Sequence, residues 1–124
     1  MTSTLRIAVS QEHGNAPVTV LRLKGEIDAN TQAELESKAA EAVGAGTQNL
    51  LLDLSDVTYM SSAGFRAMHA IAGKLGDEQS ASAIKSSHLK LLSPSAEVSK
   101  VIKTLGFDTY LVIYEDIDQA VNSF

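Results

Sequence analysis

The chain has 124 residues, 44% of them hydrophobic, and a formal net charge of -5 at pH 7. This length fits a single domain with its own core, and the absence of cysteine excludes disulfides and thiolate metal sites. The ten Lys and Arg residues are scattered rather than clustered, which argues against a nucleic-acid groove or an anionic membrane surface.

The N-terminal sequence MTSTLRIAVSQEHG has neither a basic n-region nor an apolar h-region. No apolar run approaches the roughly 18 residues that a membrane span requires. We therefore predict a cytoplasmic protein that binds a protein or a small molecule, with no nucleic acid and no membrane among its partners.

Five segments have the composition of β-strands. The first two are joined by a polar loop with Gly and Pro, which favours an antiparallel pair, and the third is a continuous apolar run typical of a central parallel strand. The predicted strands are residues 4–9, 18–25, 48–55, 89–94 and 110–114.

Four segments show apolar residues at helical spacing. The first starts near Asp28 or Asn30, where Thr31 and Glu34 form a capping-box pattern, and the third is capped by Ser95. The predicted inward faces are Leu35, Ala39, Ala40 and Val43; Phe65, Met68, Ile71, Ala72 and Leu75; Val98, Val101, Ile102 and Leu105; and Ile117, Ala120, Val121 and Phe124.

The order β-β-α-β-α-β-α-β-α predicts an α/β (α+β layered) fold. Because right-handed crossovers join parallel strands, we expect a single mixed, mostly parallel sheet of four to five strands with four helices, and Leu50–Leu54 in a central strand. Residues 77–87 form a polar loop whose only large apolar side chain is Ile84, so we expect it to be the most mobile internal segment.

The stretch DLSDVTYMSSAGF places two adjacent serines, Ser61 and Ser62, between a strand and a helix. No glycine precedes Ser62 by two residues, so the G-x-S-x-G pattern of a hydrolase is absent. The available bases, His13, His69 and His88, fall in a loop, on a helix and at the start of a strand. We therefore predict that the protein is not an enzyme.

Cofactor and metal motifs are missing as well. The segment GAGTQNL lacks the lysine of a phosphate-binding loop, and no G-x-G-x-x-G opens a helix after a strand. The carboxylates of Asp53, Asp56, Asp116 and Asp118 do not have metal-loop spacing. We predict neither cofactor nor metal.

Capping the helix requires only one of the two serine hydroxyls, so the other hydroxyl has no evident structural role. The first turn of a helix is a favourable place for a phosphate, because free backbone N–H groups and the positive end of the helix dipole stabilise the added charge. A modification site on Ser61 or Ser62 is therefore chemically sensible.

Three segments carry a resemblance to a known family: VLRLKGEIDANTQAELE, NLLLDLSDVTYMSSAGFRAM and LKLLSPSAEVSKVIKTLGFDTYLVIYEDIDQAV. Together they resemble the STAS domain of bacterial anti-sigma-factor antagonists. That family has a G-E-[LI]-D segment, a D-L-S-x-V-x-[FY]-[ILM]-D-S-S-G junction and a later S-P-S or N-P-S turn. The resemblance runs over nearly the whole chain and implies one STAS domain over residues 1–124.

The resemblance also implies a site. The family's phospho-acceptor position falls on Ser62, with Ser61 as the alternative; Ser61 stands where the family has aspartate, and Ala63 replaces the second serine. The implied partners are an anti-sigma factor that is itself a serine kinase and a metal-dependent serine phosphatase. The expected partner-binding residues are Glu26, Asp28, Ser61, Gly64 and Phe65.

In this interpretation the protein docks the anti-sigma factor while Ser62 is unphosphorylated, and a phosphate on Ser62 ejects it. We expect the missing Cβ of Gly64 to let the partner approach, so that Gly64→Ala costs binding or phosphorylation. Helix propensity alone would make the same change stabilising unless φ is positive. Two alternatives stay open: a constitutive scaffold or transport-accessory STAS protein, and a nucleotide-sensing STAS module.

Overall fold

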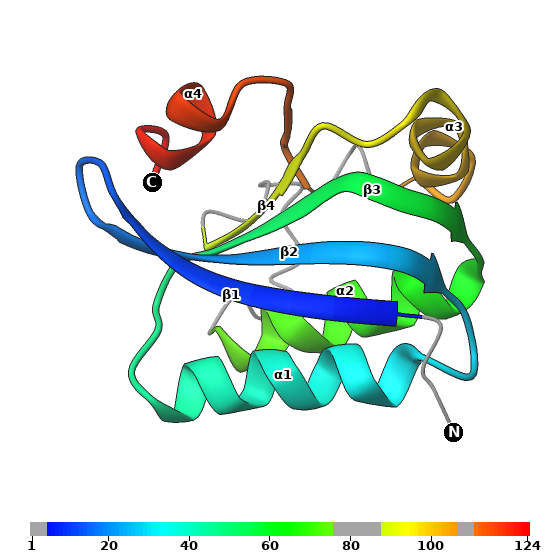
Figure 1. Cartoon of the computed structure of the whole chain (residues 1–124), viewed down its shortest axis with the longest axis horizontal. Helices are drawn as coiled ribbons and strands as arrows, with labels where there is room; N and C mark the ends of the chain where they lie inside the picture. The colour runs from blue at the N-terminus through cyan, green and yellow to red at the C-terminus, as the bar shows by residue number, and fades with distance from the viewer. Residues whose placement is uncertain (1–4, 76–87, 107–110) are drawn as a thin grey trace.

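The computed structural model describes residues 5–75, 88–106 and 111–124. Figure 1 shows a twisted sheet with helices on both sides. In chain order the elements are β1 (Leu5–His13), β2 (Pro17–Ile27), α1 (Gln32–Gly44), β3 (Leu50–Met60), α2 (Ser62–Lys74), β4 (Leu89–Leu92), α3 (Ala96–Thr104), β5 (Ile113–Tyr114) and α4 (Ile117–Val121).

The five strands form one sheet in the order β1-β2-β3-β4-β5, which makes β3 the central strand. β1 pairs with β2 antiparallel, and the remaining neighbours are parallel. The prediction of a mixed, mostly parallel sheet with four helices is confirmed. The predicted mobile loop 77–87 lies outside the described residues.

Three strands are longer than predicted, and β2 extends by only one residue at its start and two at its end. β1 continues to His13 rather than ending near residue 9, and β3 continues to Met60 rather than ending near residue 55. The polar residues in these extensions lower the apparent strand signal, but their backbones pair with the long strand β2 between them. The extension of β3 matters for function because it brings the strand directly to Ser61.

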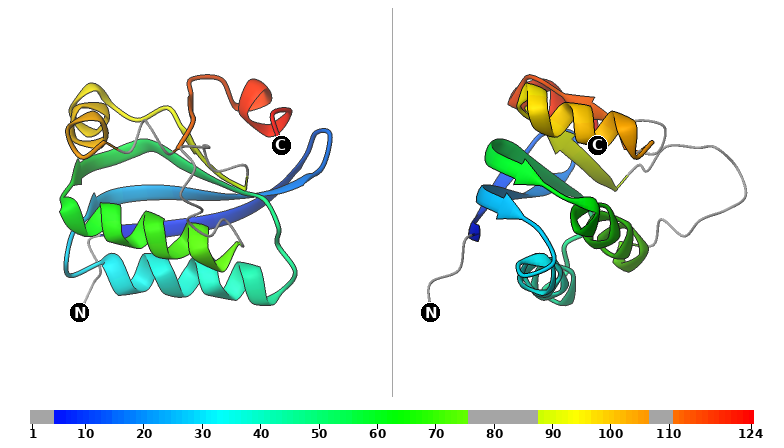
Figure 2. Two further views of the ribbon diagram at one scale, coloured as in Figure 1. Left: turned by 180° about the vertical axis from the view of Figure 1, so that it is seen from behind. Right: turned by 90° about the vertical axis from the view of Figure 1, so that its right-hand side faces the viewer.

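The first half of the central strand is buried on both faces. Figures 1 and 2 show α1 and α2 side by side on one side of the sheet and α3 and α4 on the other. Leu50 and Leu52 belong to the main core with α1 and α2, whereas Leu51 points to a second cluster with Ala120 and Val121 of α4. This explains the uninterrupted run of leucines, because alternate side chains serve opposite layers.

The pairing between β2 and β3 shifts register twice. Arg22 lies opposite Asp53, but Lys24 lies opposite Asp56, so β3 carries an extra residue at this point. A second shift follows between Gly25 and Glu26 of β2. Such bulges bend a strand and redirect the residues that follow it.

The carboxylate of Asp53 fastens the first bulge. Its Oδ1 accepts hydrogen bonds from the backbone N of Ser55 at 3.0 Å and the Ser55 hydroxyl at 2.7 Å, and its Oδ2 accepts from Arg22 Nε at 3.1 Å. Burial by itself would raise the pKa of Asp53, but the hydrogen bonds from Ser55 and then Arg22 outweigh it, so the pKa lies below its ordinary value.

The start of α1 differs from the predicted capping box. Thr31 occupies the N-cap position but makes no side-chain cap hydrogen bond. Instead its buried hydroxyl donates to the carbonyl of Glu26 at 2.9 Å and accepts from the backbone N of Asp28 at 3.0 Å. The Thr31 side chain is therefore committed to closing the turn between β2 and α1, and it is not available to Glu34.

Candidate functional site

The junction between β3 and α2 is held by Ser61. Its backbone is extended, with φ -100° and ψ -178°, and its hydroxyl accepts a hydrogen bond from the backbone N of Ala63 at 3.1 Å. Its backbone N donates to the carbonyl of Ile27 at 2.9 Å, which ties the end of β3 to the end of β2. Of the two candidate serines, Ser61 is therefore the helix cap.

Ser62 is the first residue of α2 and its side chain is exposed. Its hydroxyl makes no hydrogen bond with any described residue, so the capping role falls on Ser61 alone. The first turn of α2 contains no acidic side chain. The exposed hydroxyl thus stands at the positive end of a helix dipole, where an added anion would be stabilised.

Gly64 and Phe65 follow on the same helix. Gly64 is buried, and a Cβ added there would lie 2.7 Å from Cγ of Met60 and 3.2 Å from Cγ2 of Ile27. The missing Cβ therefore faces packed side chains inside the molecule, so we expect an alanine at this position to cost packing that outweighs its gain in helix propensity. Phe65 is half-buried and packs against the main core, which leaves part of its ring at the surface.

The predicted acidic residues lie at the same end of the sheet. Glu26 and Asp28 flank Ile27, whose carbonyl accepts the hydrogen bond from Ser61. The Asp28 carboxylate accepts hydrogen bonds from the backbone N of Asn30 at 2.9 Å and Thr31 at 3.2 Å. Asp28 therefore has a structural role in the turn before α1, while its half-exposed side chain remains part of the surface.

Sequence reasoning missed Tyr59 as a member of this surface. Tyr59 lies directly opposite Glu26 in the pairing of β3 with β2, and 51% of it is exposed. An aromatic residue this exposed, two positions before the helix cap, is a natural contact for a partner. The aromatic position of the D-L-S-x-V-x-[FY] pattern was the signal that could have identified it.

None of the three histidines is arranged as a base for Ser62. The Ser62 hydroxyl makes no hydrogen bond to a described residue, and His69 is exposed farther along α2. His13 ends β1, and the Nδ1 of His88 is 3.0 Å from Oδ1 of Asn49. The described residues therefore provide no activated serine nucleophile at this junction.

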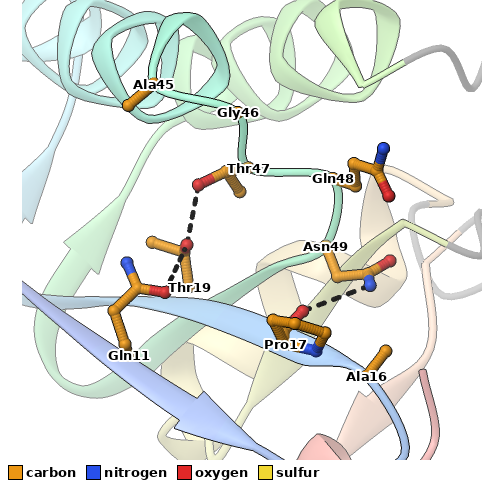
Figure 3. A pocket seen from close by; sticks show the side chains of 9 residues that line it. All are labelled: Gln11, Ala16, Pro17, Thr19, Ala45, Gly46, Thr47, Gln48 and Asn49. Atoms are coloured by element: carbon orange, nitrogen blue, oxygen red, sulfur yellow. Dashed lines mark hydrogen bonds between the residues drawn. The ribbon is translucent and has the colours of Figure 1, made fainter.

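A separate hollow of about 360 Å³ lies where β2 and β3 begin and α1 ends. Figure 3 shows its lining, in which the Thr19 hydroxyl donates to Gln11 Oε1 at 3.1 Å and is 2.7 Å from the Thr47 hydroxyl. Because the hydrogen of Thr19 goes to Gln11, Thr47 is the donor of the second bond. The lining residues carry no formal charge. Ser62 follows the other end of β3, so the hollow is separate from the serine site.

Within residues 5–75, 88–106 and 111–124, no group of three or more His, Cys, Asp or Glu side chains is arranged to hold a metal ion. In the same residues, no helix has both the length and the apolar character that crossing a membrane would take.

The fold and the serine at the start of α2 define the class of the protein. The sequence profile of the STAS domain matches residues 8–120, so the chain belongs to the STAS domain family. Among curated relatives, it is 34% identical over 73 residues to the anti-sigma-F factor antagonist RsfB of Mycobacterium tuberculosis strain H37Rv. That match covers 59% of this chain and 57% of RsfB, so it spans little more than half of the relative.

Solved structures share the fold. An anti-sigma factor antagonist from Mycobacterium paratuberculosis superposes with a TM-score of 0.77 at 24% identity, over 96% of this chain and 92% of the other. The unphosphorylated form of the anti-sigma factor antagonist SpoIIAA gives a TM-score of 0.67 at 20% identity, over 91% and 93%. At this identity the likeness establishes the fold, and the predicted STAS-like architecture is confirmed.

Proposed function

We propose that this chain is an anti-sigma-factor antagonist and a non-enzymatic protein-binding module of the cytoplasm, formed by one STAS domain over residues 1–124. In the proposal it docks a kinase-type anti-sigma factor while Ser62 is unphosphorylated, and a phosphate on Ser62 releases it. A metal-dependent serine phosphatase is the proposed partner that resets the switch.

The observation that carries the proposal is that only one of the two serines is needed to cap α2. Ser61 caps α2 through its hydroxyl, whereas the exposed Ser62 hydroxyl is free of structural duties among the described residues. A kinase can therefore modify Ser62 without removing the helix cap. Two findings from relatives support the proposal: RsfB is named an anti-sigma-F factor antagonist, and SpoIIAA has also been solved in a phosphorylated form.

The proposed docking surface is the rim around this hydroxyl, made by Glu26, Asp28, Tyr59, Ser61 and Phe65. Glu26 and Asp28 bring two carboxylates to the rim, and Tyr59 brings an exposed ring. Gly64, which the sequence also assigned to partner binding, is buried beneath this rim, where its missing Cβ leaves room for Met60. Glu26 and Asp28 fit partner cations at the periphery of the interface, whereas the neutral Ser62 hydroxyl and the exposed ring of Tyr59 fit an uncharged, apolar part of the partner surface, where a phosphate would find no cation to pair with.

A phosphate would act on this rim through charge and size. It adds about -1.5 to -2 charges and three strong acceptors at the N-terminus of α2, where the helix dipole stabilises it in the free protein. In the complex the same group must be desolvated beside Glu26 and Asp28, which raises the local negative charge. Phosphorylation therefore stabilises the free state and destabilises the docked state.

Incubation with ATP and the kinase-type anti-sigma factors of the source organism tests the modification. We expect one phosphate, mapped to Ser62 by intact mass and peptide fragmentation. Ser62→Ala should abolish it, whereas Ser61→Ala should keep it but lower the free energy of unfolding by about 1 kcal/mol through loss of the cap. A phosphate that disappears in Ser61→Ala and persists in Ser62→Ala would move the acceptor to Ser61.

Docking is tested separately with the same partner. Ser62→Ala should bind about as well as the parent chain, since it removes one exposed hydroxyl worth about 0.5 to 1.5 kcal/mol at most. Ser62→Glu should bind more weakly because it brings one of the phosphate's charges to the rim. Equal binding by Ser62→Glu and Ser62→Ala, with no phosphate under any host kinase, would favour the constitutive scaffold instead.

The nucleotide-sensing alternative gains no support from the hollow in Figure 3. Its lining contains no Lys or Arg, and it receives the C-terminal end of α1, whose dipole is negative. A nucleotide phosphate would find neither a cation nor a helix N-terminus there. A thermal shift with nucleotide, absent in the proposed switch, would revive this alternative.

A further inference from the structure

The outer edge of β1 is open within the described part of the chain. β1 is the first strand of the sheet, and no described strand pairs with its other side. It is nine residues long and contains no proline. An edge strand of this length exposes a row of backbone donors and acceptors that can pair with another chain.

Three side chains of β1 have no partner among the described residues. Val9 is 51% exposed, although it lies opposite the core residue Leu21. Arg6 and Glu12 make no hydrogen bond or ion pair with any described residue, and Arg6 even lies opposite a like charge, Lys24.

We propose that the partner of this edge is a second copy of the chain, paired β1 to β1 in antiparallel fashion about a two-fold axis at Val9. In this register Val9 faces Val9 of the second copy, and Arg6 of each chain faces Glu12 of the other. The dimer therefore joins two sheets into one and forms two symmetric ion pairs.

The register follows from the alternation of side chains. Residues opposite each other in an antiparallel pair point to the same face, so odd positions of β1 must meet odd positions. Centring the axis on Ala8 would place Arg6 opposite Ser10 and leave Glu12 beyond the pairing. Centring it on Ser10 would leave Arg6 beyond the pairing. Only the axis at Val9 brings the two opposite charges together.

The surroundings of Val9 fit this arrangement. A shallow groove of about 230 Å³ runs beside Val9 between β1 and α1, where the small side chains of Ala42 and Ala45 lie beside the charged Lys38 and Glu41. Two such grooves would meet at the axis, and the paired valines would be removed from water there. The interface leaves the junction of β3 and α2 two strands away, so the proposal does not depend on the phosphorylation switch.

Charge reversal tests the register with matched variants. Sedimentation from micromolar to near-millimolar concentration should show a monomer–dimer equilibrium for the parent chain. Arg6→Glu and Glu12→Arg should each weaken the dimer about tenfold, because each places like charges opposite each other twice. The double variant should restore the parent's dimer, since both pairs return with exchanged signs.

Controls separate folding from association. Arg6→Glu places an opposite charge across from Lys24, so its fold should be at least as stable as the parent's by thermal unfolding. Lys100→Glu, on the exposed surface of α3, changes the net charge equally and should leave the dimer unchanged. A dimer that ignores the single reversals, or a double variant that is not restored, would overturn the proposal.

Cross-linking gives a second test because the chain has no cysteine of its own. Val9→Cys should form a disulfide-linked dimer on mild oxidation, since directly opposite residues lie within bridging distance. Ser10→Cys should not, because the two copies of residue 10 would have α-carbons about 8 Å apart. Equal cross-linking of both variants would refute the register, and a monomer at every concentration would refute the dimer.

Discussion

At the scale of single residues, two neighbouring serines have different physical situations. Ser61 is half-buried and has an extended backbone, and its hydroxyl accepts a hydrogen bond from the backbone N of Ala63. Ser62 is one residue further, inside the helix and exposed. A shift of one position along a strand-to-helix junction therefore separates a structural hydroxyl from a hydroxyl that is open to modification.

Gly64 gives the sharpest prediction at this scale. A Cβ at Gly64 would stand 2.7 Å from Cγ and 3.1 Å from Sδ of Met60, so Gly64→Ala must displace a side chain in the core. We expect it to lower the free energy of unfolding by about 1 to 3 kcal/mol in urea denaturation.

Gly73 is the matched control in the same helix. A Cβ there meets nothing within 4 Å, so Gly73→Ala should raise the free energy of unfolding by about 0.5 to 1 kcal/mol through helix propensity. If both alanines stabilised the protein alike, the close packing of Gly64 against Met60 would be wrong.

At the scale of the elements, the long central strand β3 positions Ser61 and Ser62, because it ends directly before them. Its first half is buried on both faces, whereas its second half carries polar and exposed residues beyond the bulge at Asp53. The hydrogen bonds to Asp53 keep β3 paired with β2 through this irregular stretch. We therefore expect the geometry of the serine junction to depend on a carboxylate in the middle of the preceding strand.

This dependence predicts a pH effect. The fold lowers the pKa of Asp53 below its ordinary value of 3.8, so the charged carboxylate contributes stability above that pH and loses it as the pH falls toward the folded-state pKa. Asp53→Asn should cost about 1 to 3 kcal/mol at neutral pH and progressively less under acid conditions, measured by urea denaturation.

Asp56→Asn is the control for this effect. Asp56 is exposed and lies opposite Lys24 without a hydrogen bond or ion pair to a described residue, so Asp56→Asn should lower the free energy of unfolding by less than about 1 kcal/mol, the size of an exposed cross-strand charge pair. A cost for Asp53→Asn that stays constant from neutral to acid pH would show that the charge of Asp53 is not what stabilises the bulge.

At the scale of the whole molecule, the C-terminal segment closes the second cluster over a buried cation. Lys90 of β4 is only 7% exposed, and its Nζ donates to the carbonyl of Ser123 at 2.8 Å and the Ser123 hydroxyl at 3.0 Å. The same Nζ lies 4.6 Å from the ring centroid of Phe124. The end of the described chain thereby links β4 to α4 and to the apolar side chains beneath it.

Phe124→Ala should therefore destabilise the fold by about 1 to 3 kcal/mol, because it removes both apolar contact and the cation–π interaction with Lys90. Phe124→Leu, which keeps most of the apolar contact, should recover part of this loss. Gln119→Ala on the exposed side of α4 is the control and should be nearly neutral in thermal and urea unfolding. A neutral Phe124→Ala would mean that the segment does not secure Lys90.

Hydrophobic pattern, turn residues and a local motif determined much of this protein from its sequence alone. The leucine run from Leu50 to Leu54 predicted a central strand, and the apolar spacing after Ser62 predicted α2, because burial imposes a regular period on side chains. The family resemblance likewise pointed to the serine junction. These features depend mainly on neighbours in sequence, so a linear pattern can reveal them.

Other features were decided only by tertiary structure. The polar half of β3 is a strand because β2 and Asp53 hold it, and Thr31 serves the turn with Glu26 rather than a capping box. At Gly64, Met60 and Ile27 crowd the position that a Cβ would take. In each case the deciding group lies across a turn or on another strand. Packing and hydrogen bonding between such groups override local propensity, because a buried polar group or an occupied volume costs more than a helix or strand preference.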